Sequence, residues 1–209
     1  MKWLVEIFKA KPARQTERDF FDACDAFMKG KEIWHEASLI NGEGWRESKL
    51  LKIQQALRLF DKAIEKGLKG RNETEIFSGF DESEVYALRG HCLNDLGYYF
   101  EALEDFNLAI TKHPRKGIAS NYHIRSLIKD SLFDFDGSLA DIKEAIRLSK
   151  LDNDDNAYWN NYAKSTGFAS ATAFYELACP TQENILRKKK AYSGKEIEEK
   201  LKEIKRRMP

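Results

Sequence analysis

The sequence predicts an all-helical protein, and three observations support this fold class. Apolar residues recur every three or four positions along most of the chain, which is the period of one helix face. Only four prolines and twelve glycines interrupt 209 residues, so long stretches lack helix breakers. No segment shows the alternation of apolar and polar residues that a strand would require.

The first predicted helix covers about residues 17–40 and is followed by a second that Gly67 can close. Thr16 and Asp19 resemble a capping box at the start of the first helix. Its apolar residues form two stripes that are offset around Gly30, namely Phe20, Cys24 and Phe27, then Ile33, Ala37 and Ile40. The second helix carries one continuous stripe, made of Leu50, Ile53, Leu57, Phe60 and Ile64.

A helix pair is predicted next, between Asp81 and Pro114, with its turn at Gly97. Its two apolar stripes are Val85, Leu88, Cys92 and Leu96, then Leu103, Phe106 and Ile110. The pattern recurs over residues 119–152, and more weakly over 153–180 around Gly167. Ser193 and Glu196 then resemble a capping box for a last helix, whose apolar face holds Ile197, Leu201 and Ile204.

The second helices of these pairs share an internal repeat. Small and large residues alternate at spacings of four and three, as in Ala56, Phe60, Ala63, then Ala102, Phe106, Ala109, then Ser138, Ile142, Ala145. Residues 83–116 resemble a tetratricopeptide repeat, with weaker copies at 17–67, 119–152 and 153–180. The matching positions are Tyr86, Gly90, Leu93, Gly97, Tyr99, Ala102, Phe106, Ala109 and Pro114, whereas Arg89 stands where the family usually has leucine.

This resemblance implies a single domain over residues 1–209, built as a right-handed α-solenoid of antiparallel hairpins. Its parts are an N-terminal segment (1–15), a divergent first hairpin (17–67), an inserted loop (68–82), the repeats (83–180) and a C-terminal amphipathic capping helix (193–207). Ala109 and Ala145 are 36 residues apart, but Ala63 and Ala109 are 46 apart, which places about 12 extra residues in the loop. The loop, with Ile76, Phe77 and Phe80, either folds back on the solenoid or forms an apolar lip beside its groove.

Members of the tetratricopeptide family bind peptides or protein segments in a concave groove lined by the first helix of each hairpin. Carried over by position, the groove residues are Glu84, Ala87, His91, Asn94, Asp95, Ser120, His123, Leu127, Asp130, Asn161 and Lys164. This lining is polar, mixed and slightly acidic. It lacks the Lys, Asn and Arg set with which one subclass clamps a terminal carboxylate, so a basic or polar segment is the expected ligand.

Other chemistry finds little support in the sequence. His91, Asp95 and His123 could be drawn as a metal site, but their spacing is not that of a dedicated one. No nucleophile elbow, P-loop or HExxH motif is present, and Cys24, Cys92 and Cys179 have no CxxC spacing. We therefore expect three reduced core thiols, no metal, no cofactor, no small-molecule substrate and no enzymatic activity.

The two ends of the chain differ from its middle. Net charge is +1, yet residues 187–209 hold ten Lys or Arg against four Glu. Capping of the solenoid is the preferred interpretation of this basic end, and contact with nucleic acid or an acidic partner is the alternative. The N-terminal Trp3, Leu4, Ile7 and Phe8 could pack on the first hairpin or on a second copy in a homodimer, with interfacial membrane binding as the alternative.

Two functions from different classes follow from these patterns. The first is a cytoplasmic interaction or scaffold protein that holds a peptide or protein segment in its groove. The alternative is a peripheral assembly factor that its terminal segments recruit to membranes or to acidic surfaces, including nucleic acid. The cytoplasmic location is expected because the N-terminus lacks the features of a signal peptide.

Overall fold

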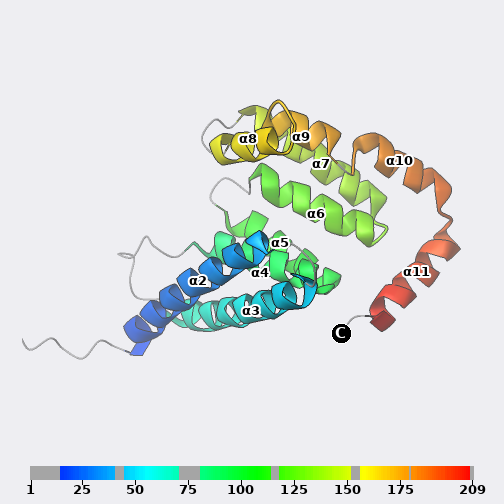
Figure 1. The fold of residues 1–209 in the computed structure, drawn as a ribbon. Coiled ribbons are helices and arrows are strands. Elements are labelled where there is room, and N and C mark those ends of the chain that lie inside the picture. Colours follow the sequence, from blue (N-terminus) through cyan, green and yellow to red (C-terminus); the bar gives the residue numbers. More distant parts are fainter. Residues whose placement is uncertain are drawn as a thin grey trace, which may run out of the picture. The chain divides into compact units, whose positions relative to one another are not determined.

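The computed structural model describes residues 15–40, 45–70, 81–113, 118–151, 156–178 and 180–207. Within these ranges all regular structure is helical, which confirms the prediction of an all-α fold (Figure 1). The chain divides into two compact units, residues 1–81 and 82–209, where the sequence predicts one domain. Most of the N-terminal segment and of the inserted loop, with its apolar residues, lies outside the described residues, as does Cys179.

The first unit is a hairpin of two long helices, α2 (Gln15–Leu39) and α3 (Trp45–Gly70). The helices approach closely at Gly30, where an added Cβ would lie 2.8 Å from Cε1 of Phe60. A side chain at this position would overlap the Phe60 ring, so the glycine is a packing requirement. Lys66 of α3 joins the two helices by ion pairs to Asp19 (3.2 Å) and Asp22 (2.8 Å).

The second unit begins with two further hairpins, α4 (Glu82–Leu96) with α5 (Tyr99–Lys112), and α6 (Ala119–Ser131) with α7 (Phe135–Leu151). Both turns have the hydrogen bonds of a Schellman motif. In the first, the N–H of Tyr98 donates to the carbonyl of Leu93 at 2.9 Å and Gly97 adopts φ +88°. In the second, Asp134 donates to Lys129 at 2.9 Å and Phe133 adopts φ +60°.

In each of these hairpins the two helices approach closely, and the residues at the point of contact differ. An added Cβ on Gly90 of α4 would lie 2.9 Å from the Phe106 ring of α5, which repeats the contact seen at Gly30. In the next hairpin Ser126 of α6 stands at the position of Gly90 and Ser138 of α7 at that of Ala102, and both serines are fully buried. Their hydroxyls hydrogen-bond at 3.0 Å, and Ser138 Oγ also donates to the carbonyl of Ser126 at 2.9 Å. Both hydroxyls are therefore satisfied where α6 and α7 approach.

Each of these two hairpins also contains an ion pair at the same position of its repeat. Arg89 donates from Nε (2.7 Å) and Nη2 (2.6 Å) to Asp105, and Arg125 donates from Nε (2.8 Å) and Nη2 (2.6 Å) to Asp141. The two pairs are 36 residues apart at both ends. Each arginine thus ties the first helix of its hairpin to the second by bidentate bonds. Arg89, which stands where the resemblance to the tetratricopeptide repeat predicts leucine, is engaged in the first of these pairs.

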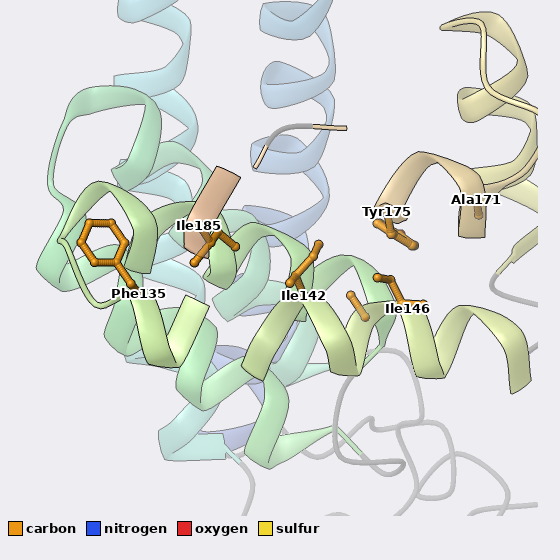
Figure 2. Close-up of a cluster of buried hydrophobic side chains, with 7 residues drawn as sticks. Phe135, Ile142, Ile146, Ala171, Tyr175 and Ile185 are labelled. Atoms are coloured by element: carbon orange, nitrogen blue, oxygen red, sulfur yellow. The ribbon is translucent and has the colours of Figure 1, made fainter. Parts of the chain in front are cut away.

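A hairpin forms over 153–180 as expected, with its turn at Gly167, but its second helix rather than its first packs along the preceding hairpin. The chain forms α8 (Asn156–Ser165), α9 (Ala171–Leu177) and α10 (Gln182–Ala191). α9 and α10 both pack along α7, while α8 packs on α9. Figure 2 shows Ala171 and Tyr175 of α9 beside Ile146, and Ile185 of α10 nearer the other end of α7. The helices that lie against α7 after the second of these hairpins are therefore α9 and α10.

The last helix, α11 (Gly194–Arg207), begins with the predicted capping box. The backbone N–H of Ser193 donates to Oε2 of Glu196 at 2.8 Å, and the backbone N–H of Glu196 donates to Oγ of Ser193 at 3.3 Å. Its apolar residues pack on two clusters, and Ile197 contacts the one that α7, α9 and α10 form around Ile142. Leu201 and Ile204 pack against the cluster of Ala102, Phe106, Ile128 and Leu132, which belongs to α5 and α6. No residue of α11 is buried.

Among the described helices, none is both long enough and apolar enough to cross a membrane.

Candidate functional site

The surface expected to bind a ligand begins on α4. Asp95 is exposed there, and Glu84, Ala87, His91 and Asn94 are partly buried. Ala87 packs against the α5 and α6 cluster, and the His91 ring meets the Phe106 ring edge-on with centroids 5.2 Å apart. Asn94 and Asp95 are therefore the residues of α4 whose side chains are best placed for an outside partner.

Two expected groove residues of α6 are buried. Ser120 is 7% exposed and His123 is 5% exposed. The His123 ring lies against two aromatic rings of α9, with centroid distances of 5.3 Å to Phe174 and 5.1 Å to Tyr175. Its Nε2 atom is buried without a hydrogen-bond partner among the described residues. His123 therefore packs between helices, where a ligand in the groove has little access to it.

Both histidines are held neutral by their surroundings. Burial lowers the pKa of His91 to about 4. Burial also lowers the pKa of His123 to about 4, and the nearby charge of a protonated His91 adds to that effect. Charging either imidazole would place a cation in surroundings that exclude water, which disfavours the charged form. At neutral pH the pair therefore contributes no charge to the site.

A pocket of about 330 Å³ lies between α6 and α10. Leu127 and Asp130, two of the expected groove residues, line it together with Ser131, Pro180, Asn184, Arg187 and Lys188. Lys188 forms an ion pair with Asp130 across the pocket, and Arg187 Nη2 donates to Asn184 Oδ1 at 3.3 Å. The pocket thus combines an aliphatic wall with polar groups of both signs, which is a typical lining for a binding site.

The two groove residues expected on α8 do not line this pocket. Asn161 and Lys164 are exposed on α8, which packs on α9. The helix that faces α6 is α10, and its polar residues Asn184, Arg187 and Lys188 were missed by the sequence reasoning. Thr181 caps this helix by accepting from the N–H of Asn184 at 3.2 Å, and lysines fill its last turn. Such a start and end are signals from which the helix could have been predicted.

The contribution of α10 changes the charge of the site. Lys188 neutralises Asp130, and Arg187 is exposed beside it. The slight acidic excess expected from α4 and α6 is therefore offset here. Among the described residues, no group of three His, Cys, Asp or Glu side chains is placed to hold a metal ion.

Comparison with known proteins gives little further information. No family model matches the chain, and no curated protein matches it. One solved structure that matches is the crystal structure of BtubC (BKLC) from P. vanneervenii, with 14% sequence identity and a TM-score of 0.38. The match covers 91% of this chain and 83% of that chain.

Proposed function

We propose that this protein is a non-enzymatic interaction or scaffold protein that binds a peptide or protein segment on the surface formed by α4, α6 and α10. The observation that carries the proposal is the pocket between α6 and α10. It brings residues of two helices, 50 to 60 positions apart in sequence, to one hollow with aliphatic and charged walls. An extended segment could continue from this pocket along Asn94 and Asp95 of α4.

We further infer that the chain is a short solenoid of the tetratricopeptide type. The Schellman turn around Gly97 and Phe133 occurs again at Gly167, where Phe168 donates to Ala163 at 2.8 Å and φ is +91°. The three turn residues are 36 and 34 residues apart, close to the roughly 34-residue period of that family. The repeated Arg–Asp pair supports the same inference, because it occurs once in each of two successive hairpins.

The ligand is proposed to be polar. Asp95 and Asp130 contribute negative charge, Arg187 and Lys188 contribute positive charge, and the Leu127 side chain offers the pocket its aliphatic wall. Mixed charges of this kind favour hydrogen-bonded recognition of one segment over general attraction to a single sign of charge.

The proposal is tested by a capture experiment with the full chain. A groove variant carries Asn94→Ala, Leu127→Ala and Arg187→Ala, which truncate half-buried or exposed side chains of α4, α6 and α10. Partners are captured from an extract of cells that express the protein, identified, and then titrated in purified form. The groove variant should lose at least tenfold in affinity, because each truncated side chain lines the proposed contact surface.

The matched control carries Glu104→Ala, Leu108→Ala and Lys143→Ala, three exposed residues of the second helices α5 and α7. It should bind as the wild type does. Equal affinity of the wild type and the groove variant, or an equal loss in both variants, would overturn the groove assignment.

The alternative function, recruitment to membranes or acidic surfaces by the ends of the chain, is less well supported. Leu201 and Ile204, the apolar residues of α11, face a cluster of the protein itself. The helix therefore does not present its apolar side for insertion into a lipid interface.

A further inference from the structure

A second and larger pocket, of about 500 Å³, lies between α11 and the turns of the two hairpins α4–α5 and α6–α7. It shares only Ser131 with the pocket between α6 and α10. Its lining consists of Leu96, Gly97, Tyr99, Ser131, Phe133, Lys200, Glu203, Ile204 and Arg207. We call this hollow the turn pocket.

The walls of the turn pocket are mainly apolar. Leu96 and Tyr99 come from the first turn, Phe133 from the second and Ile204 from α11, and all four are partly buried. Aliphatic and aromatic walls from three segments of the chain therefore surround one space. An apolar side chain of a partner that entered it would lose its contact with water, which favours binding.

Phe133 occupies a position where the equivalent turns have glycine. Gly97 and Gly167 adopt φ of +88° and +91° without strain, whereas Phe133 adopts φ +60°. The left-handed conformation is unfavourable for a residue with a side chain. The Phe133 ring contacts Phe135 and Tyr192, with centroids 6.0 and 5.3 Å away, and it forms one wall of the turn pocket. Strained residues of this kind are frequent at binding sites.

The rim of the turn pocket carries a positive charge. Glu203 is paired with Arg207 at 2.5 Å, so these two groups cancel. Lys200 forms no ion pair with any described residue, and Lys205 lies next to the rim with its ammonium 5.2 Å from the Phe100 ring centroid. An apolar hollow beside an unpaired lysine is complementary to a ligand that joins an apolar group to a carboxylate.

The apolar residues of α11 are only partly covered by the rest of the protein. Ile197, Leu201 and Ile204 are partly buried, and no residue of the helix is fully buried. The part of Ile204 that stays exposed lies in the wall of the turn pocket.

We propose that the turn pocket is an interaction surface for a partner polypeptide that presents an aliphatic or aromatic side chain next to a carboxylate. The apolar side chain enters between Tyr99, Phe133 and Ile204, and the carboxylate pairs with Lys200. Nucleic acid fits this surface less well, because four glutamates lie on α11 itself and the walls are apolar.

The test uses the full chain and a capped tripeptide, acetyl-Glu-Phe-Glu-amide, with acetyl-Gln-Phe-Gln-amide as its uncharged equivalent. Binding is followed by amide chemical shifts in two-dimensional NMR spectra. The acidic peptide should shift the signals around Gly97, Phe133 and Ile204 and bind at least fivefold more tightly than the uncharged peptide. Lys200→Glu should weaken the acidic peptide at least tenfold, and Lys202→Glu, on the same helix but outside the pocket, should leave its affinity within twofold.

A second variant separates the apolar contact from the charge. Phe133→Gly keeps the left-handed turn accessible and removes the ring, so it should weaken both peptides by a similar factor. The proposal is overturned by absent or unlocalised shifts, by equal affinity for the two peptides, or by an unchanged affinity in Lys200→Glu. It is also overturned if a single-stranded oligonucleotide or vesicles with phosphatidylserine shift the same signals at lower concentration than the acidic peptide does.

Discussion

His123 shows how burial can change the role of a residue that the sequence pattern assigns to a surface. The resemblance to the tetratricopeptide repeat predicts a groove residue at this position of α6, yet Phe174 and Tyr175 of α9 cover its ring. The covering residues are about 50 positions further along the chain. A local pattern carries no information about such a distant contact. Whether the imidazole is exposed was therefore decided by the packing of α9.

The burial of His123 predicts a dependence of stability on pH. The pKa is lowered from 6.5 to about 4 on folding, so between these values the unfolded chain binds a proton that the folded chain does not. Stability is therefore complete above pH 6.5 and falls as the pH drops toward 4, by about 1.4 kcal/mol per pH unit for each such group. Between pH 7.5 and pH 5.0, the free energy of unfolding of His123→Leu should fall by about 2 kcal/mol less than that of the wild type.

Urea unfolding at the two pH values measures this difference. Carboxylates and His91 titrate in both proteins, so their effects cancel in the comparison. Equal losses of stability in the wild type and in His123→Leu would show that the imidazole is not buried as described.

The glycine predictions had mixed outcomes, since Gly67, expected to close the second helix, lies inside α3, whereas Gly90 was placed correctly. Gly90 was expected where two helices approach, and an added Cβ there would lie 2.9 Å from Phe106. The spacing of a small residue against a large one is a local property of one hairpin, since both residues lie within 16 positions of each other. Short-range constraints of this kind are visible in a single sequence.

At the scale of the elements, the repeated ion pair is the feature that the sequence pattern left unexplained. Asp141 has a side chain only 5% exposed and accepts from Arg125 on both oxygens, with Lys129 Nζ 2.8 Å from Oδ2. Arg125 Nη1 also donates to Asn107 of α5 at 2.8 Å, which links one hairpin to the next. Buried charges are tolerated only when they are paired in this way.

Replacing one residue of this ion pair should lower the free energy of unfolding more than replacing both residues does. Arg125→Met leaves Asp141 buried with Lys129 alone, and it should lower the free energy of unfolding by about 3 kcal/mol. The double variant Arg125→Met, Asp141→Leu replaces the pair by apolar side chains and should recover at least half of that loss. Urea unfolding of the three proteins at pH 7.5 measures both changes. A double variant less stable than the single one would contradict the pairing.

The helices after α7 show why element boundaries and packing partners are harder to predict than helices themselves. The sequence favoured a hairpin over 153–180 because Gly167 resembles the turn glycine Gly97, and it does form the same type of turn. The helix before that turn, α8, nevertheless packs on α9 rather than continuing the array along α7. α10 was overlooked because its run of lysines was interpreted as a basic tail. One buried residue, Ile185, anchors α10 in the α7 cluster.

At the scale of the molecule, two core clusters among the described residues lie wholly within the second unit. The clusters around Phe106 and around Ile142 draw only on residues after Glu82, and both Arg–Asp pairs lie there as well. A fragment of residues 82–209 should therefore fold alone, with a helical circular-dichroism spectrum and a cooperative thermal transition. A fragment that lacks a cooperative transition would show that the first unit supplies part of this core.

The sequence by itself determined the helical class, the three hairpins up to α7 and the close contacts within them. These features depend on helix period, on turn residues and on spacings inside one hairpin, all of which are local. Tertiary structure alone decided that α10 faces α6, that α11 lies against the turns and that His91 and His123 are packed between helices. Those outcomes depend on which apolar surfaces meet when distant segments fold together, and the free energy of that burial is a property of the whole unit.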